Sequence, residues 1–275
     1  SYQNVSRSLQ GAIPGLTVTF SDGKPTRGAS FQVRGANSIG AGGSALILVD
    51  GVETDITTVN SEDIESISVL KDASSTAVYG SRGTFGVILI TTKRPEKGQM
   101  KITYNGSYNF YKRTVTPELV DNGYDWTTSY LEAYTNSYAT DPTNINNVFR
   151  FSRAWYSELE RRNSDPSYEK WRINPADNRY EYFGNTNWYK IFYKDYTTGH
   201  QHNLSITGGT DKASYYVSGR FFHQDGIYNA GDERYNQYNV LAKGTVQATK
   251  WLRVENTTSF MSRFSHQPTL TTGGQ

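Results

Sequence analysis

Cysteine is absent from this 275-residue sequence. Its absence excludes disulfide frameworks and thiolate metal sites, although it is compatible with any cellular compartment. An excess of charge of one sign is also missing, because 28 basic and 26 acidic residues leave a formal net charge of +2. A formal charge this close to zero argues against a nucleic-acid-binding surface, so a nucleic-acid partner is not expected.

Long apolar runs are missing as well. The longest aliphatic runs, 45–49 and 87–90, fall far short of the roughly 20 residues that a membrane-spanning helix needs. Membrane-spanning β-strands remain possible, since they need only about 9 to 11 residues with alternate positions apolar. The 21 tyrosines suit such strands, but a soluble β-rich surface that binds sugars would also be rich in tyrosine.

The stretch 69–93, VLKDASSTAVYGSRGTFGVILITTK, contains a strand, a helix and a second strand. Asp72 is expected to cap the helix 73–79, and Gly80 to close it in a left-handed conformation. Residues 87–90 are apolar at both odd and even positions, which indicates a strand covered on both faces. The pattern predicts a compact β-α-β unit with an exposed glycine-rich loop after the helix.

This stretch resembles the plug domain of TonB-dependent outer-membrane transporters of the SusC/RagA type. Upstream segments that share the similarity, in the order of that family, are LQGAIPGLTVTF (9–20), FQVRGANSIG (31–40) and ALILVDGVE (45–53). Downstream segments that resemble the first barrel strands are NTNWYKIFYKD (185–195), HNLSITGGTDKASYYVSG (202–219) and KWLRVENTTSF (250–260). The similarity covers nearly the whole chain except roughly 114–184.

The resemblance implies a fold of two parts. Residues 1–95 would form an α+β plug domain with a small mixed sheet and short helices, truncated at its N-terminus. Residues 96–275 would form antiparallel transmembrane strands, the first part of a barrel of about 22 strands, with a long external loop at 113–198. The remaining barrel strands would have to pair with the two open edges, so we expect this chain to be part of a larger transporter.

A hydrophobic period of two supports the strand assignment independently of the resemblance. Positions expected to face lipid are Tyr104, Tyr108, Leu204, Ile206, Tyr238 and Val240. Positions expected to face the lumen or the plug are Asn105, Asn203, Asn239 and Lys243. The expected connections alternate between long and short, as in an outer-membrane barrel with long external loops and short periplasmic turns.

The long insertion is predicted to be helical in places. Thr116 and Pro117 would begin one helix, Asp125 would cap another, and Trp155 and Leu159 recur at helical spacing. An aromatic stripe formed by Trp126, Tyr130 and Tyr134 could contact a ligand. Packing against neighbouring loops is the favoured interpretation, since apolar stripes on helices usually face a core.

No constellation of residues indicates an enzyme, a cofactor or a metal site. His200 and His202 share one face of a strand, but the sequence places no third ligand nearby, and an aqueous strand end is the favoured role. The glycine-rich segment 40–43 lacks the ending of a phosphate-binding loop. Acidic residues between Asp50 and Asp55 do not have the spacing of a calcium-binding loop and are interpreted as turns.

The resemblance implies import of an oligomeric nutrient, either a glycan or a peptide, across the outer membrane of a Gram-negative bacterium. It also implies a SusD-like surface lipoprotein as a lid, TonB as the energy source through a segment ahead of Ser1, and contact with outer-membrane lipid. Candidate substrate-binding residues in the apical plug loops are Asn37, Ser38, Ser81 and Arg82. The alternative hypothesis is a soluble glycan-binding or adhesion module. A polysaccharide hydrolase would need a pair of suitably placed carboxylates.

Overall fold

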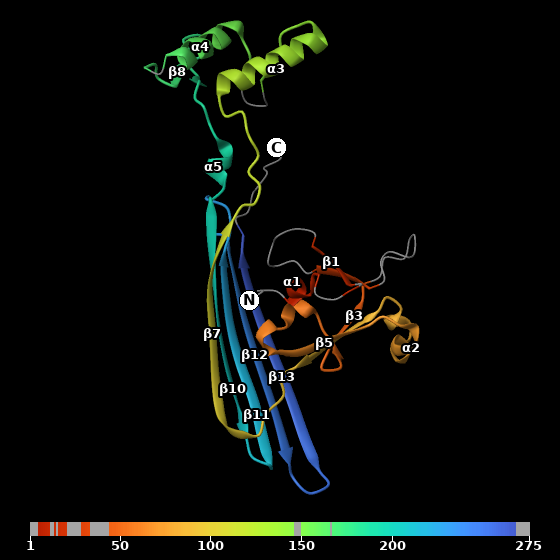
Figure 1. Cartoon of the computed structure of the whole chain (residues 1–275). Helices are drawn as coiled ribbons and strands as arrows, with labels where there is room; N and C mark the ends of the chain where they lie inside the picture. The colour runs from red at the N-terminus through yellow and green to blue at the C-terminus, as the bar shows by residue number, and fades with distance from the viewer. Residues whose placement is uncertain are drawn as a thin grey trace. The chain divides into compact units, whose positions relative to one another are not determined.

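The computed structural model describes residues 5–11, 14, 16–20, 29–33, 44–145, 150–165 and 167–267. The chain divides into two compact units, Ser1–Tyr111 with Tyr196–Gln275, and Lys112–Asp195. Figure 1 shows the small sheet and the long strands of the first unit, and the helices of the second. Within the ranges that the structure describes, no helix is both long and apolar enough to cross a membrane.

The N-terminal part of the first unit contains a four-stranded mixed sheet with the order β4-β3-β6-β5. β3 (Leu46–Val49) runs parallel to β6 (Val87–Thr92). β4 (Val52–Glu53) and β5 (Ile64–Leu70) are antiparallel to β3 and β6, respectively. A separate antiparallel ribbon is formed by two strands beside helix α1 (Val5–Leu9), namely β1 (Leu16–Phe20) and β2 (Ala29–Val33). The expected small mixed sheet is confirmed.

The helix between β5 and β6 is shorter than the sequence suggested. The α-helix α2 covers only Ala73–Thr76, and the 3-10 segment η3 (Ala77–Gly83) follows it. The expectation that the Asp72 side chain caps the helix is wrong, because it makes no capping bond, and its backbone carbonyl instead accepts from the Ser75 hydroxyl at 2.9 Å. Gly80 has a positive φ of 58° but lies inside η3, where it kinks the backbone.

The small domain has its own hydrophobic core. Val87 and Ile88 are both fully buried although they are consecutive, which confirms that β6 is covered on both faces. All the buried members of the core cluster lie between Val5 and Ile90, and Phe31 is the largest of them. Gly86 precedes β6 with a φ of 95°, and a Cβ built there would lie 2.7 Å from Cβ of Val33. The backbone therefore approaches Val33 too closely for any side chain at that position.

The remaining strands of the first unit form one antiparallel sheet with the order β13-β12-β11-β10-β7. Its strands are β7 (Gly98–Lys112), β10 (Tyr196–Gly209), β11 (Ala213–Asp225), β12 (Arg234–Gln247) and β13 (Arg253–His266). The connections are long after β7, short after β10, longer after β11 and short after β12. This is the alternation that the sequence predicted.

The second unit contains the expected helices at partly different positions. α3 covers Gly123–Tyr138 and α4 covers Arg153–Ser164, and a hairpin and a short helix follow them: β8 (Trp171–Ile173), β9 (Tyr180–Tyr182) and α5 (Trp188–Phe192). Its buried cluster consists of Ile145, Trp155, Leu159 and Phe183.

The sequence misplaced the start of the first helix in this unit. Thr116 and Pro117 lie in irregular structure, so the helix expected there is absent from this described segment. Asp125 lies in the first turn of α3 rather than capping it. The cap is Asn122, whose side-chain oxygen accepts from the backbone N–H groups of Tyr124 at 2.9 Å and Asp125 at 3.3 Å. These bonds satisfy two donors that a helix N-terminus leaves free.

Candidate functional site

Two of the four residues expected to contact substrate can be located. Ser81 and Arg82 follow the kink at Gly80, whereas Asn37 and Ser38 lie outside the described residues. Ser81 and Arg82 line the same open depression of about 590 Å³, together with residues of β3 and the turn that follows β4. The Arg82 guanidinium also forms an ion pair with Glu53, and both side chains are more than half exposed. The depression is thus open to solvent and lined by both polar and apolar side chains.

The two faces of the long strands differ as the sequence predicted. Side chains on the outward face are 42% to 60% exposed at Tyr104, Tyr108, Leu204, Tyr238 and Val240, whereas Ile206, which was also expected there, is only partly exposed. The opposite face is polar and contacts the small domain. Each of the four residues expected to face the lumen or the plug contacts the small domain: Asn105 to Glu62 (3.2 Å), Asn203 to Asn60 (2.8 Å), Asn239 to Thr58 (2.7 Å) and Lys243 to Asp50 (2.9 Å).

One group of these contacts surrounds two short 3-10 turns, η1 (Ile56–Thr58) and η2 (Ser61–Asp63). The Asn60 side chain caps η2 with its oxygen and donates with its nitrogen to Asn203 and to Asp63. Tyr216 of β11 donates its hydroxyl to the other Asp63 oxygen at 2.8 Å. These polar groups are buried, and each has a hydrogen-bond partner, as burial requires.

Strands β12 and β13 add contacts to the same turns. Gln237 and Asn239 donate to the backbone carbonyls of Thr57 and Thr58, at 3.4 Å and 2.7 Å. Arg263 donates to the Thr57 hydroxyl at 3.1 Å. We call residues 57–63 with their partners on β10 to β13 the upper seam; its bonds come from four neighbouring strands.

A second group of contacts is centred on one lysine. Lys243 is only 9% exposed, and its ammonium group contacts the Asp50 carboxylate at 2.9 Å and the Thr92 carbonyl at 3.1 Å. Asp50 also accepts from the Thr92 backbone N–H at 3.0 Å and from its hydroxyl at 2.6 Å. Partial burial alone would raise the pKa of Asp50, but these hydrogen bonds and the Lys243 charge hold it below its usual value. We call Asp50, Thr92 and Lys243 the lower seam.

A cavity of about 670 Å³ lies beside the lower seam, between the small domain and the long strands. Asp50 and Lys243 themselves contribute to its lining. Other charged residues around it include Arg94, Lys97, Lys212 and Arg253, and the acids Asp211 and Glu255. Its volume is in the range of small-molecule binding sites.

Sequence reasoning did not identify Asp50, Asp63, Tyr216 or Arg263 as contact residues. Asp50 was assigned correctly to a turn: it has a φ of 50°, and Gly51 follows with a φ of 87°. The adjacent Asp and Gly were a signal for this hairpin turn. Nothing in the spacing of the sequence indicated that the carboxylate would meet a lysine almost two hundred residues later.

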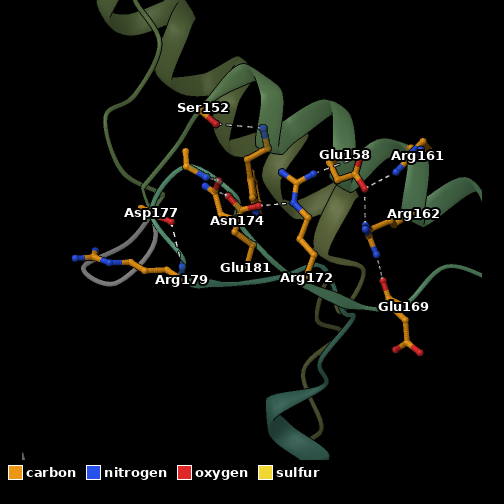
Figure 2. A network of polar contacts seen from close by, with 12 residues as sticks. Ser152, Glu158, Arg161, Arg162, Glu169, Arg172, Asn174, Asp177, Arg179 and Glu181 are labelled. Atoms are coloured by element: carbon orange, nitrogen blue, oxygen red, sulfur yellow. Dashed lines mark hydrogen bonds and ion pairs between the residues drawn. The ribbon is translucent and has the colours of Figure 1, made fainter.

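The second unit is held together by a network of charged side chains, shown in Figure 2. Glu158 of α4 contacts Arg161 at 2.6 Å and Arg162 at 2.8 Å, and the guanidinium of Arg172 at 3.7 Å. Arg172 in turn contacts Glu181 of β9 at 2.7 Å, so the network joins α4 to the hairpin. The hydrogen bond from Arg161, together with Arg162, holds the pKa of Glu158 below its usual value although partial burial opposes this.

The aromatic stripe of α3 is only partly packed. Tyr130 donates to the carbonyl of Asn144, which agrees with the favoured interpretation of contact with a neighbouring loop. Trp126 remains 44% exposed and stacks on Tyr130, with ring centroids 5.5 Å apart. Trp126 also lines an apolar pocket of about 440 Å³ with Trp155 and Trp188.

Comparison with known proteins assigns the small domain. Residues 1–87 match the family model of the TonB-dependent receptor plug domain. The TonB-dependent receptor P3 of Formosa agariphila is 32% identical over 260 residues, which is 92% of this chain and 21% of that receptor. The TonB-dependent receptor SusC of Bacteroides thetaiotaomicron is 43% identical over 120 residues, or 40% of this chain and 12% of SusC.

Solved structures agree with these matches. The structure of the RagAB peptide transporter superposes with a TM-score of 0.72 at 27% identity, covering 96% of this chain and 29% of the matched chain. This chain thus spans about a fifth to a third of the length of the relatives that it matches along most of its own length. Each of these proteins is named as a receptor or a transporter. With a plug domain followed by antiparallel strands, the chain belongs to the TonB-dependent transporters of the SusC/RagA type.

Proposed function

We propose that the protein containing this chain imports an oligomeric nutrient, a glycan or a peptide, across the outer membrane of a Gram-negative bacterium. The main support is the pairing of a plug domain with strands whose outward face is apolar and whose inward face bonds to that domain. A soluble module would have no need for this division of faces. In this proposal, residues 1–95 are the plug and 96–275 are the first barrel strands, with an external segment at 113–198.

The proposed partners are TonB and a SusD-like surface lipoprotein. The folded plug has its own core, so displacing it requires work, and a protein at the outer membrane has no nucleotide supply to provide that work. TonB would supply it by pulling on the plug from the periplasmic side. The lipoprotein would close over the outer mouth and retain the nutrient. The SusC and RagAB relatives support both partnerships.

Uptake by cells that express the full-length protein tests this function. Isotope-labelled oligosaccharides and oligopeptides would be offered separately to otherwise identical cells with and without TonB. We expect one of the two classes to accumulate only when TonB is present, while its binding at the cell surface persists in both strains. Normal accumulation without TonB would contradict the proposal. Recovery of the full-length protein in the soluble fraction without detergent would favour the alternative, a soluble binding module.

For the substrate site, we propose the apical plug loops with Asn37, Ser38, Ser81 and Arg82. Ser81 and Arg82 contribute polar side chains to an open depression, where they can hydrogen-bond to a ligand. Replacing all four residues by alanine should weaken ligand binding measured by calorimetry on the full-length protein. Glu53→Ala is the matched control, because it removes the ion-pair partner of Arg82 but leaves the guanidinium in place. Equal affinity of the fourfold variant and the unmodified protein would move recognition to other loops or to the lid.

A further inference from the structure

The two seams between the plug and the strands differ in how many strands hold them. The upper seam is held from β10, β11, β12 and β13, through Asn203, Tyr216, Gln237, Asn239 and Arg263. Two of its bonds end on backbone carbonyls of η1 rather than on side chains that could rotate away. At the lower seam, one residue of the long strands, Lys243 of β12, contacts both Asp50 and Thr92.

The seams also differ in access to water. Asn60, Asp63, Asn203 and Asn239 of the upper seam are all less than 7% exposed. Separating these groups would leave buried donors and acceptors without partners, which is costly. The lower seam borders the cavity of about 670 Å³. There, Lys243 and Asp50 can be hydrated as they separate, and the flexible stem of a lysine allows its charge to swing away without a backbone shift.

We propose that the lower seam is a latch and the upper seam an anchor, so that the plug opens asymmetrically. On this proposal, the small sheet tilts about residues 57–63, which stay docked and keep the bond from Lys93 N–H to the Asp63 carbonyl, while the turn after β3 moves away from β12. Release of Lys243 from Asp50 joins the existing cavity to the space above it, and the passage runs between β3, β6 and strands β12 and β13. The cavity lining is rich in charged side chains, so the passage suits a hydrophilic cargo.

This inference rests on the proposed function, and thiol labelling can test the two separately. The chain has no cysteine of its own, so single cysteines can be introduced into a full-length protein from which any others are removed. Thr92→Cys reports on the lower seam, because Thr92 is 3% exposed. Ser218→Cys reports on the upper seam, because Ser218 is 2% exposed on β11, two residues from Tyr216. The probe is fluorescein maleimide, applied to living cells with and without TonB.

We expect labelling of Thr92→Cys to rise several-fold when TonB is active and labelling of Ser218→Cys to stay low. Adding Lys243→Met to Thr92→Cys should raise its labelling in cells that lack TonB, since the latch is then absent. Arg263→Met is the matched control, because it removes one cation from the upper seam and should leave Thr92→Cys labelling unchanged. Equal expression and equal heat stability of the variants in detergent would show that they fold.

The opposite patterns would overturn the latch. If TonB raised labelling of Ser218→Cys as much as or more than that of Thr92→Cys, the plug would leave as a whole or open at the upper seam, while TonB-driven transport would stand. If labelling at both positions and nutrient uptake were indifferent to TonB, both the latch and the proposed function would fail. A lack of any effect of Lys243→Met in cells without TonB would also contradict the latch.

Discussion

Gly86 precedes β6 in a backbone conformation that L-residues rarely adopt, directly against Val33. Two separate costs therefore meet at one position: the strain of a positive φ, about 1–2 kcal/mol, and the crowding of a packed core, about 1–3 kcal/mol. Gly51 has a similar φ of 87° but nothing lies within 4 Å of a Cβ built there. Comparing substitutions at Gly86 and Gly51 therefore separates the cost of crowding from the cost of backbone strain.

We predict that Gly86→Ala lowers the free energy of unfolding of the plug by about 3 kcal/mol, and that Gly51→Ala lowers it by about 1–2 kcal/mol. Hydrogen exchange of the amides in β6, measured in the full-length protein, reports both values. Equal losses for the two variants would show that the contact with Val33 contributes nothing beyond the backbone strain.

Single residues also mark the limit of what the sequence could predict. The inward positions Asn203, Asn239 and Lys243 could be assigned, because the strands alternate and parity alone decides their face. Their partners could not, because Asn60 and Asp50 lie in turns whose approach to the strands depends on the whole fold. The cap Asn122 was missed in favour of Asp125, since both side chains can accept from a backbone N–H and the sequence does not distinguish them.

Among the elements, helix α3 provides a direct test of its capping residue. Asn122→Ala removes an oxygen that accepts from two backbone N–H groups and should destabilise the helix by about 0.5–2 kcal/mol. Asp125→Ala is the control, because Asp125 lies in the first turn and affects the helix mainly through its charge near the N-terminus, about 0.3–1 kcal/mol. Amide exchange along α3 measures both, and a larger loss for Asp125→Ala would reverse the assignment of the cap.

The long strands provide a test of their two faces. Val240 lies on the outward face of β12 and Thr257 lines the inner cavity from β13. Val240→Arg should cost about 2–4 kcal/mol if that face contacts lipid, whereas Thr257→Arg should cost much less. Refolding of the full-length protein into phospholipid vesicles at graded urea concentrations gives both free energies. Equal tolerance of arginine at the two positions would count against a membrane-spanning sheet.

The elements were the most predictable level of this molecule. A period of two is a strong signal, and it indicated β7, β10 and β12, whereas it was weaker in β13 and β11 was expected from the resemblance. The stretch 73–83 was less predictable, because a helix of one turn and a 3-10 segment have no periodicity that distinguishes them. In the same way, the two short turns η1 and η2 that anchor the plug had no signal of their own.

For the whole molecule, acidity should loosen the contact between plug and strands. The pKa of Asp50 is held below its usual value in the folded protein, so its contribution to stability is present above about pH 4. That contribution is lost as the pH falls through the lowered pKa, because protonation removes the charge that Lys243 and Thr92 stabilise. We predict that, relative to the rest of the plug, the amides of β3 and of the end of β6 in the unmodified protein exchange faster at acidic pH than at neutral pH.

Asp50→Asn is the control for this prediction, since its side chain does not titrate. Below the lowered pKa of Asp50, exchange of this variant in β3 and β6 should resemble that of the unmodified protein, whereas at pH 6 it should be clearly faster. If acidification to below that pKa left β3 and β6 of the unmodified protein as protected as at pH 6, relative to the rest of the plug, the Asp50 contact would contribute little to holding the plug.

The two ends of the insertion between β7 and β10 are in direct contact with each other. Within the second unit, Arg113 contacts Asp195 at 3.0 Å and its guanidinium lies 4.7 Å from the ring centre of Tyr189. A flexible loop of this length would slow the pairing of the strands on either side, since chain entropy opposes bringing distant ends together. A compact unit whose own ends are in contact reduces that kinetic penalty. We therefore expect β7 and β10 to pair more quickly than they would across a flexible loop of the same length.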